Sequence, residues 1–301
     1  MLDLAPYLDS GLSPLTASRE GLRRYPIGNT DKSIGDGITI MGVVNLSTLS
    51  RYRESIAISP EAAINRARRL VLEGADLVDI GCESTSINTP AVAAKEQAET
   101  LVPIVAALTE SGVPVSIETY HPSVAEKCLA VGAAVINITA IPDSNDLYRV
   151  IAEHDATGII CFYGGDNPRD ISSRPAHSDP LHGVATFFET QIDRAASVGL
   201  EQLVLDPGAG FTYRDLPDGP VRVRHQLQVI MQSARLNALG RPICNALPHA
   251  FTFFGEELRS GEGLFAVLAA IGGTSLFRTH EVRQIEAIVQ CLALVAQPPS
   301  V

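Results

Sequence analysis

The sequence predicts an α/β protein that folds as a single (β/α)8 barrel, and three observations lead to this prediction. The chain has 301 residues, of which 46% are hydrophobic and 19% charged, so it can bury a sizeable core. Short apolar runs recur along it, and each is followed by a segment with helical periodicity. Such near-continuous apolar runs are typical of parallel strands buried on both faces. Eight strand–helix repeats favour a closed barrel over a doubly wound open sheet, although periodicity alone leaves the two architectures close.

The elements follow one another in a regular order. The expected strands cover residues 38–46, 76–81, 113–119, 134–139, 158–163, 203–208, 242–247 and 274–280. The first helix should begin after the N-cap Ser59 with Pro60 in its first turn, and it should end at Gly74. Further helices are expected at 94–111, 123–131, 144–154, 184–198, 222–239, 263–271 and 282–296. We expect residues 1–37 to form an irregular N-terminal arm and residues 38–301 to form one barrel domain, because no linker divides that stretch.

Charge and composition exclude several classes of function. The net charge of −11 argues against a nucleic-acid partner, because phosphate binding needs clustered cations. No apolar run reaches the roughly 18 residues of a membrane helix, and the N-terminus does not read as a secretory signal. The five cysteines are an odd number without CxxC spacing, which indicates reduced thiols rather than disulfides or a zinc site. We therefore expect a cytoplasmic protein with neither a membrane nor a nucleic-acid partner.

Polar and small residues stand at the carboxyl ends of the expected strands, where the chemistry of a (β/α)8 barrel is located. In chain order they are Asn45; Gly81, Cys82, Glu83, Ser84 and Thr85; Glu118; Asn137; Cys161; Asp206, Pro207 and Gly208; His249; and Arg278, Thr279 and His280. Any one of them could simply cap the next helix. The whole series indicates a functional site.

Three of these residues suit the edge of a heterocycle. Asp206 ends the apolar run LVLDPG, and the Pro-Gly that follows argues against a helix N-cap. A buried carboxylate needs hydrogen-bond donors, which a guanidine-like N–C–N edge supplies in pairs. Glu118 and Asn137 end neighbouring strands and could hold the same edge, although hydrogen bonds to the barrel backbone are an equal alternative.

Other strand-end residues suit an anion. Arg278 and His280 are two positions apart on the last strand and therefore share a face, which predicts an anion clamp. The alternative for Arg278 is a salt bridge to a helix carboxylate. Asn45 could bind Mg²⁺ or reach a phosphate oxygen. Ser84 and Thr85 could donate hydroxyl contacts to anionic oxygens, or they could belong to an ordinary turn.

The same positions carry a family resemblance. The segments MGVVN, EGADLVDIGCEST, VPVSIETY, AAVINIT, LVLDPGAGF and FRTHEV resemble, in this order, the motifs of the dihydropteroate synthases, which are pterin-binding barrel enzymes. The resemblance spans about residues 38–296. It implies a transferase that joins 6-hydroxymethyl-7,8-dihydropterin pyrophosphate to p-aminobenzoate and releases pyrophosphate with the help of Mg²⁺. It also implies a homodimer formed through the later helices.

The resemblance also implies roles for individual residues. Asp206 and Asn137 match ligands of the pterin edge, and Glu118 matches a third pterin ligand that is normally Asp. Cys161 stands where the family has a Met that packs on the pterin. The Mg²⁺ and pyrophosphate ligands of the family are matched by Asn45, Thr85, Arg278 and His280.

Departures from the family pattern cluster around the amine pocket. His249 aligns with a Lys that contacts the pterin, and Leu247 aligns with a Ser that helps to hold p-aminobenzoate. The residues at 47–51 and 86–87 also differ from the two loop motifs of the family. We therefore predict a dihydropteroate synthase-like transferase that uses p-aminobenzoate or another amine. The alternatives are a catalytically silent pterin-binding paralogue and a methyltetrahydrofolate-binding methyltransferase, which would leave Arg278 without an anion. Arg222 is expected on a solvated helix face.

Overall fold

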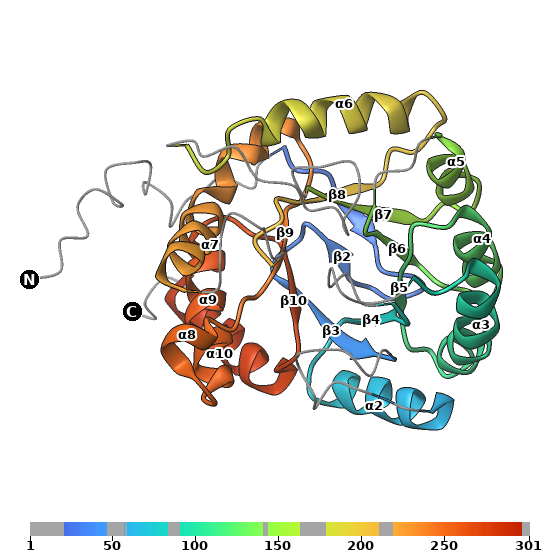
Figure 1. Cartoon of the computed structure of the whole chain (residues 1–301), viewed down its shortest axis with the longest axis horizontal. Coiled ribbons are helices and arrows are strands. Elements are labelled where there is room, and N and C mark those ends of the chain that lie inside the picture. The colour runs from blue at the N-terminus through green and yellow to red at the C-terminus, as the bar shows by residue number, and fades with distance from the viewer. Residues whose placement is uncertain are drawn as a thin grey trace, which may run out of the picture.

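The chain forms the predicted barrel of parallel strands surrounded by helices (Figure 1). The computed structural model describes residues 21–46, 57, 59–83, 91–140, 144–162, 179–210 and 219–296. Within these residues, eight strands form one sheet. An isolated parallel bridge between Leu205 and Ile243 joins the two outermost strands, and the Leu205 N–H donates to the Pro242 carbonyl at 2.9 Å. This contact closes the ring and rules out the doubly wound open sheet.

The strands lie within two residues of their predicted bounds. They are β3 (Thr39–Asn45), β4 (Leu77–Gly81), β5 (Val115–Glu118), β6 (Val135–Ile138), β7 (Thr157–Cys161), β8 (Leu203–Asp206), β9 (Cys244–Ala246) and β10 (Leu276–Thr279). They are paired in the order β8-β7-β6-β5-β4-β3-β10-β9, and every pairing is parallel. Neighbours in this order are consecutive in the chain, except that β10 pairs with β3 and so joins the last repeat to the first.

The helices alternate with the strands as expected, with local differences. They are α2 (Pro60–Leu72), α3 (Ala94–Glu110), α4 (Pro122–Ala130), α5 (Asp146–Glu153), α6 (Val184–Ala196), α7 (Pro220–Gln232), the 3₁₀ helix η2 (Ser233–Leu239), α8 (Phe251–Phe254), α9 (Leu258–Ile271) and α10 (Val282–Ala296). The predicted helix over 222–239 is thus an α-helix followed by a 3₁₀ segment. The Ser59 side chain accepts a hydrogen bond from the Ala62 N–H, which confirms the predicted N-cap of α2.

Strand alternation divides the barrel into an outer shell and a lumen. Every second residue, such as Val78, Ile80 and Ile136, packs outward against the helices in the main core. The other set faces inward, and its members near the amino ends of the strands form an apolar floor. The strand residues of this floor are Met41, Leu77, Val135, Ile159, Val204, Cys244 and Leu276. The floor fills the lower lumen, so the barrel is a packed core rather than a pore.

The part of the expected N-terminal arm that the structure describes is not irregular. Two short antiparallel strands, β1 (Tyr25–Pro26) and β2 (Ser33–Ile34), form a hairpin. Tyr25, Ile27 and Ile34 are buried in contact with the apolar floor. The prediction of an irregular arm was wrong here because strands this short carry no readable periodicity, and their burial depends on the barrel that they cover.

Two further sequence-based expectations concern membranes and thiols. No helix in the described part of the chain is both long and apolar enough to cross a membrane. All five cysteines are free thiols, and Cys128, Cys161 and Cys244 are buried. Burial raises the pKa of Cys128 to about 12, so this thiol stays protonated at neutral pH.

We expect the hairpin to contribute directly to the stability of the barrel. Replacing Ile34 by Ala removes a fully buried side chain from the apolar floor and should lower the free energy of unfolding by about 2–4 kcal/mol. Urea denaturation measures the change. The control is Leu72→Ala, because Leu72 is 89% exposed and its loss should change stability by less than about 0.5 kcal/mol. A wild-type midpoint for Ile34→Ala would show that the hairpin does not seal the lumen.

Candidate functional site

The lumen is apolar at the floor and polar one layer above it. Residues two apart on a strand point the same way, so each floor residue has an inward-facing neighbour two positions further along its strand. Leu77 is followed by Asp79, Val135 by Asn137, and Leu276 by Arg278 in this way. The inward residues of this upper layer on neighbouring strands include Asp79, Ser116, Asn137, Cys161, Asp206 and Arg278, with Glu118 above Ser116. Five of the predicted strand-end residues, Glu118, Asn137, Cys161, Asp206 and Arg278, thus lie together at one end of the barrel lumen.

Arg278 lies at the centre of this layer and is held by two carboxylates. Its Nε donates to Asp79 Oδ2 and its second terminal nitrogen donates to Glu118 Oε2, both at 2.7 Å. Its side chain is 18% exposed, that of Glu118 is 12% exposed and that of Asp79 is fully buried. Burial alone would lower the pKa of Arg278, but the two carboxylates outweigh burial and raise it. The expected alternative of a helix carboxylate is wrong, because both partners lie on strands.

Asp79 is the residue that the sequence analysis missed. It stands in the middle of β4, where it accepts hydrogen bonds from Ser116 Oγ at 2.7 Å and from Asn137 Nδ2 at 3.0 Å. Asn137 Oδ1 in turn accepts a contact from the Cys161 thiol at 3.5 Å. A carboxylate inside an otherwise apolar strand was the available signal. The rule that barrel chemistry lies at strand ends does not reach this residue, because the polar layer of the lumen begins inside β4.

Asp206 is 4% exposed and contributes a second buried carboxylate. Its Oδ1 accepts a hydrogen bond from the Gly208 N–H at 2.8 Å, so part of its bonding capacity is used within its own turn. Burial raises the pKa of Asp206 to about 6, although this hydrogen bond and the charge of Arg278 act in the opposite direction. At neutral pH the group is largely ionised and still poorly solvated.

Glu118 has an even higher pKa. Burial raises it to about 7, the charge of Arg278 opposes the rise, and repulsion from Asp79 adds to it. The upper lumen therefore places three carboxyl groups around one guanidinium. Such a layer is rich in hydrogen-bond acceptors and favours a ligand that offers N–H donors.

Glu83 also follows a strand, but its contacts are structural. Its Oε2 accepts from the Val92 N–H at 2.8 Å and from Gln97 Nε2 at 3.1 Å, and its Oε1 accepts from the Tyr120 hydroxyl at 2.9 Å. These bonds tie the end of β4 to the start of α3 and to the segment after β5. This carboxylate therefore fixes the strand ends around the lumen.

The two predicted histidines meet beside a buried carboxylate. His249 Nδ1 lies 3.1 Å and His280 Nδ1 lies 3.4 Å from the same oxygen, Oε1 of Glu262. Burial opposes ionisation of Glu262, but the two imidazoles outweigh it and lower its pKa to about 2. Arg278 and His280, which were predicted to form an anion clamp, therefore have different partners. Arg278 contacts carboxylates of the lumen, whereas His280 contacts Glu262. Burial lowers the pKa of His280, and Glu262 opposes this effect.

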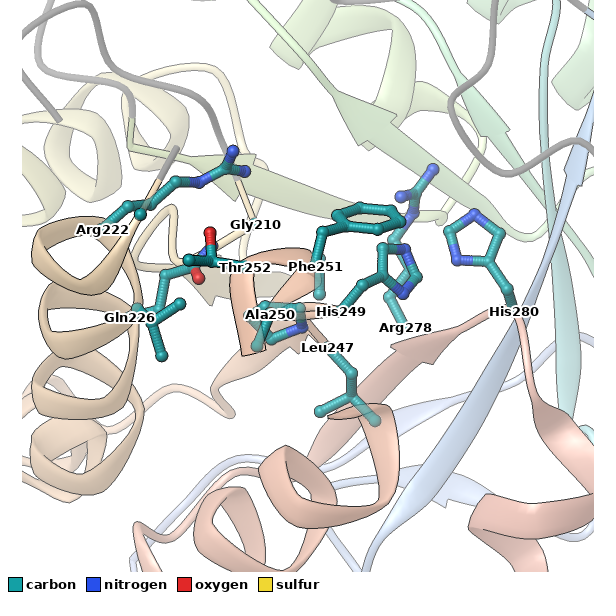
Figure 2. A pocket seen from close by; sticks show the side chains of 14 residues that line it. Gly210, Arg222, Gln226, Leu247, His249, Ala250, Phe251, Thr252, Arg278 and His280 are labelled. Atoms are coloured by element: carbon teal, nitrogen blue, oxygen red, sulfur yellow. The ribbon is translucent and has the colours of Figure 1, made fainter. Parts of the chain in front are cut away.

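A pocket adjoins the lumen on the side of α7 and α8 (Figure 2). Arg278, His280 and His249 line one side of it, and Arg222 and Phe251 line it as well. The expectation that Arg222 lies on a solvated helix face was wrong, because α7 begins next to the pocket and turns this residue toward it. Gln226 Nε2 donates to the Ala209 carbonyl at 3.0 Å and so fastens α7 to the segment after β8.

The remaining predicted site residues lie at the rim or outside the described residues. Asn45 ends β3, is half-buried, and is paired in register with Gly81 of β4. Ser84 and Thr85 lie outside the described residues, as do the loop motifs at 47–51 and 86–87. The anion-binding roles of Asn45, Ser84 and Thr85 stay predictions.

Loss of the central cation should destabilise the barrel in a pH-dependent way. Replacing Arg278 by Met leaves Asp79 and Glu118 buried without their partner and should lower the free energy of unfolding by about 3–5 kcal/mol. A carboxyl whose pKa rises on folding binds more protons in the native state, so its contribution to stability falls as pH increases through that range. Without Arg278 the pKa of Glu118 rises further, and the deficit should be larger at about pH 8 than at about pH 6.

Urea denaturation at both pH values measures this effect. The matched control is Arg235→Met, because Arg235 pairs with Asp179 while 50% exposed, and its loss should change stability by less than about 1 kcal/mol. Equal losses for the two variants would contradict the central role of Arg278.

Comparison with known proteins agrees with this geometry. Residues 41–280 match the family described as "Pterin binding enzyme". The chain is 30% identical over 273 residues to the type-2 dihydropteroate synthase of Escherichia coli, covering 86% of this chain and 97% of that protein. It is likewise 30% identical over 275 residues to the dihydropteroate synthase of Synechocystis sp., covering 87% of this chain and 92% of that protein.

Solved structures of dihydropteroate synthases are also similar to this chain. The dihydropteroate synthase of Thermus thermophilus in complex with 4-aminobenzoate is similar with a TM-score of 0.75 and 27% identity, covering 91% of this chain and 100% of that chain. The Xanthomonas albilineans enzyme in complex with 7,8-dihydropteroate is similar with a TM-score of 0.72 and 25% identity, covering 88% and 95%. The resemblance seen in the sequence motifs is thereby confirmed. The chain belongs to the pterin-binding enzyme family, as a dihydropteroate synthase-like transferase.

Proposed function

We propose that this protein joins a dihydropterin pyrophosphate to an amine that carries an anionic group, with release of pyrophosphate. The observation that carries the proposal is the acceptor-rich upper lumen, in which Asp79, Glu118 and Asp206 surround the single guanidinium of Arg278. A pterin presents an amino group and a ring N–H side by side. These donors would complement the carboxylate acceptors of the lumen.

The network around Asp79 prepares two acceptors for this edge. Because Asn137 Nδ2 is held by Asp79, its Oδ1 is directed away from that carboxylate, toward Cys161 and the lumen. Asp206 supplies a carboxylate in the same layer, one strand beyond Cys161. The contact between the Cys161 thiol and the amide oxygen is weak and can yield to a ligand N–H. The lumen therefore binds and orients the heterocycle without rearranging its charged centre.

The adjoining pocket suits the second substrate. It opens beside Arg278 and His280, and it is lined by the aromatic ring of Phe251 and by Arg222. An aromatic amine with a carboxylate could pack on the ring while its charge lies near the guanidinium. The T. thermophilus structure contains 4-aminobenzoate, which has this chemistry. A departing diphosphate would lie between the two regions, near Arg278 and His280.

Magnesium is part of the proposal. Asn45 offers an amide oxygen at the barrel rim, and Mg²⁺ commonly keeps one or two protein ligands beside substrate phosphates, so the residue present fits this ion. When bound, Mg²⁺ would neutralise part of the charge that develops on the leaving diphosphate.

We extend the proposal to a homodimer in the cytoplasm. Leu264 on α9 and Leu294 on α10 are large apolar residues that are 44% and 68% exposed, which supports an interface through the last helices. The five free thiols support a reducing compartment.

Two linked measurements test the proposed reaction. Calorimetric titration with the dihydropterin pyrophosphate, with and without Mg²⁺, should give micromolar binding that depends on the metal ion. A pyrophosphate-release assay should then show turnover with p-aminobenzoate and much less with aniline, the matched amine without a carboxylate. Binding without release for any amine tested would indicate a silent paralogue. No binding at all would exclude the pterin-diphosphate site.

Asp206→Asn separates binding from stability. The amide keeps an acceptor for the Gly208 N–H but loses the charge, so affinity for the pterin should fall by about 10- to 100-fold. Because burial raises the pKa of Asp206 to about 6, its ionised form is disfavoured in the native state, and the variant should melt at the same temperature or up to roughly 6 °C higher at about pH 8.

The wild-type protein provides an independent check by titration. Its affinity for the pterin should fall by about tenfold for each pH unit below 6, because Asp206 becomes protonated. Calorimetry and thermal unfolding measure the two effects. An Asp206→Asn variant that binds with wild-type affinity would contradict the assigned role of this carboxylate.

A further inference from the structure

A cluster of two imidazoles and one carboxylate lies at the wall of the pocket, and the proposed reaction uses only one of its members, His280, beside the departing diphosphate. His249 follows β9, Glu262 lies on α9 and His280 follows β10. One ligand atom from each of the three lies within 4.8 Å of the others. We propose that His249, Glu262 and His280 form a binding site for a divalent transition metal ion of the zinc class, distinct from the magnesium site proposed at Asn45.

The spacing of the ligand atoms fits coordination of one ion. Tetrahedral ligands at a zinc–nitrogen distance of about 2.1 Å lie about 3.4 Å from one another. The Nδ1 atoms of His249 and His280 lie 3.1 Å and 3.4 Å from Glu262 Oε1. The two rings stand side by side, with their centroids 5.2 Å apart (Figure 2). Modest side-chain rotation is therefore sufficient to bring all three atoms to bonding distance.

The carboxylate is oriented for this role by its surroundings. Glu262 is fully buried, and its Oε2 accepts hydrogen bonds from the Thr279 hydroxyl and from the His280 N–H. Its Oε1 is also buried and faces the Nδ1 atoms of both imidazoles, at 3.1 Å and 3.4 Å. Outer hydrogen bonds of this kind fix metal-binding carboxylates, and a buried charged oxygen facing two imidazoles is completed by a cation.

The backbone holds His249 against α9. A Cβ atom at Gly261 would lie 2.2 Å from the His249 carbonyl oxygen, so this close approach of α9 requires glycine at position 261. Ala250, the next residue, has φ 47° and ψ 46°, a left-handed conformation that is uncommon for alanine. Ala250 is therefore strained, and it lies next to a histidine that faces the carboxylate. Backbone strain of this kind is often found at binding sites.

The donor set identifies the class of ion. Two imidazoles and one carboxylate favour Zn²⁺, Fe²⁺, Co²⁺ or Ni²⁺ over Mg²⁺, which prefers oxygen ligands. Three protein ligands leave at least one coordination position open. Since His249 and His280 also line the pocket, the open position would face it and could accept an oxygen atom of an anion. The cysteine pattern did not indicate this site, because none of its ligands is a thiol.

Cobalt provides a direct test, and the test does not depend on the proposed transferase activity. The full chain without an affinity tag is stripped with a chelator and titrated with Co²⁺. We expect visible d–d absorption that saturates at one ion per chain, with micromolar or tighter affinity and no thiolate charge-transfer band. Elemental analysis after desalting should find one Zn²⁺ in the equivalent zinc experiment. A wild-type protein that retains neither ion would overturn the proposal.

Variants assign the ligands. His249→Ala, His280→Ala and Glu262→Gln should each weaken Co²⁺ binding by at least about tenfold. His154→Ala is the matched control, because this exposed histidine at the end of α5 lies outside the cluster, and Cys291→Ser controls for the exposed thiol. If Glu262→Gln does not fold, the two histidine variants decide the question. Wild-type affinity in both histidine variants would overturn the assignment.

Inorganic pyrophosphate tests the open position. Added to the cobalt-loaded protein, it should change the d–d spectrum while the ion remains bound after desalting. An unchanged spectrum would show that the open position does not face the pocket.

Discussion

The site depends on one guanidinium that is largely enclosed by the barrel. Arg278 on β10 joins Asp79 of β4 and Glu118 of β5, so that three strands are linked across the lumen by charge. Its charge also opposes the rise in the pKa of Asp206. Without this cation the carboxyl groups of the upper lumen would either repel one another or become protonated, and the acceptors of the proposed pterin site would be lost.

Strand alternation places this charged layer on an apolar base. The same inward faces carry Leu77, Val135 and Leu276 below and Asp79, Asn137 and Arg278 above. The N-terminal hairpin seals the lower end with Ile27 and Ile34. Water is thereby excluded from below, which is why the pKa values of Glu118 and Asp206 are raised and why the polar contacts within the lumen are strong.

β10 connects the lumen with the neighbouring pocket because Arg278 and His280, which are two positions apart, both line that pocket. Arg278 points into the lumen, whereas the hydroxyl of Thr279 binds Glu262 of α9. His280 follows and returns to the pocket side. One short segment therefore supports the proposed pterin site, the diphosphate region and the proposed metal site. A substitution of Arg278, Thr279 or His280 should therefore affect more than one of these three sites.

The sequence by itself determined the barrel, the limits of its strands and the family, because apolar runs and ordered motifs are local signals. It also indicated Asp206, Asn137, Glu118 and Arg278 as candidate site residues, because a polar residue at the end of an apolar strand can be recognised in the sequence. Only the tertiary structure decided their partners. The pairing of Arg278 with Asp79 and the meeting of His249, Glu262 and His280 join residues far apart in the chain, and the closure of the ring sets those distances.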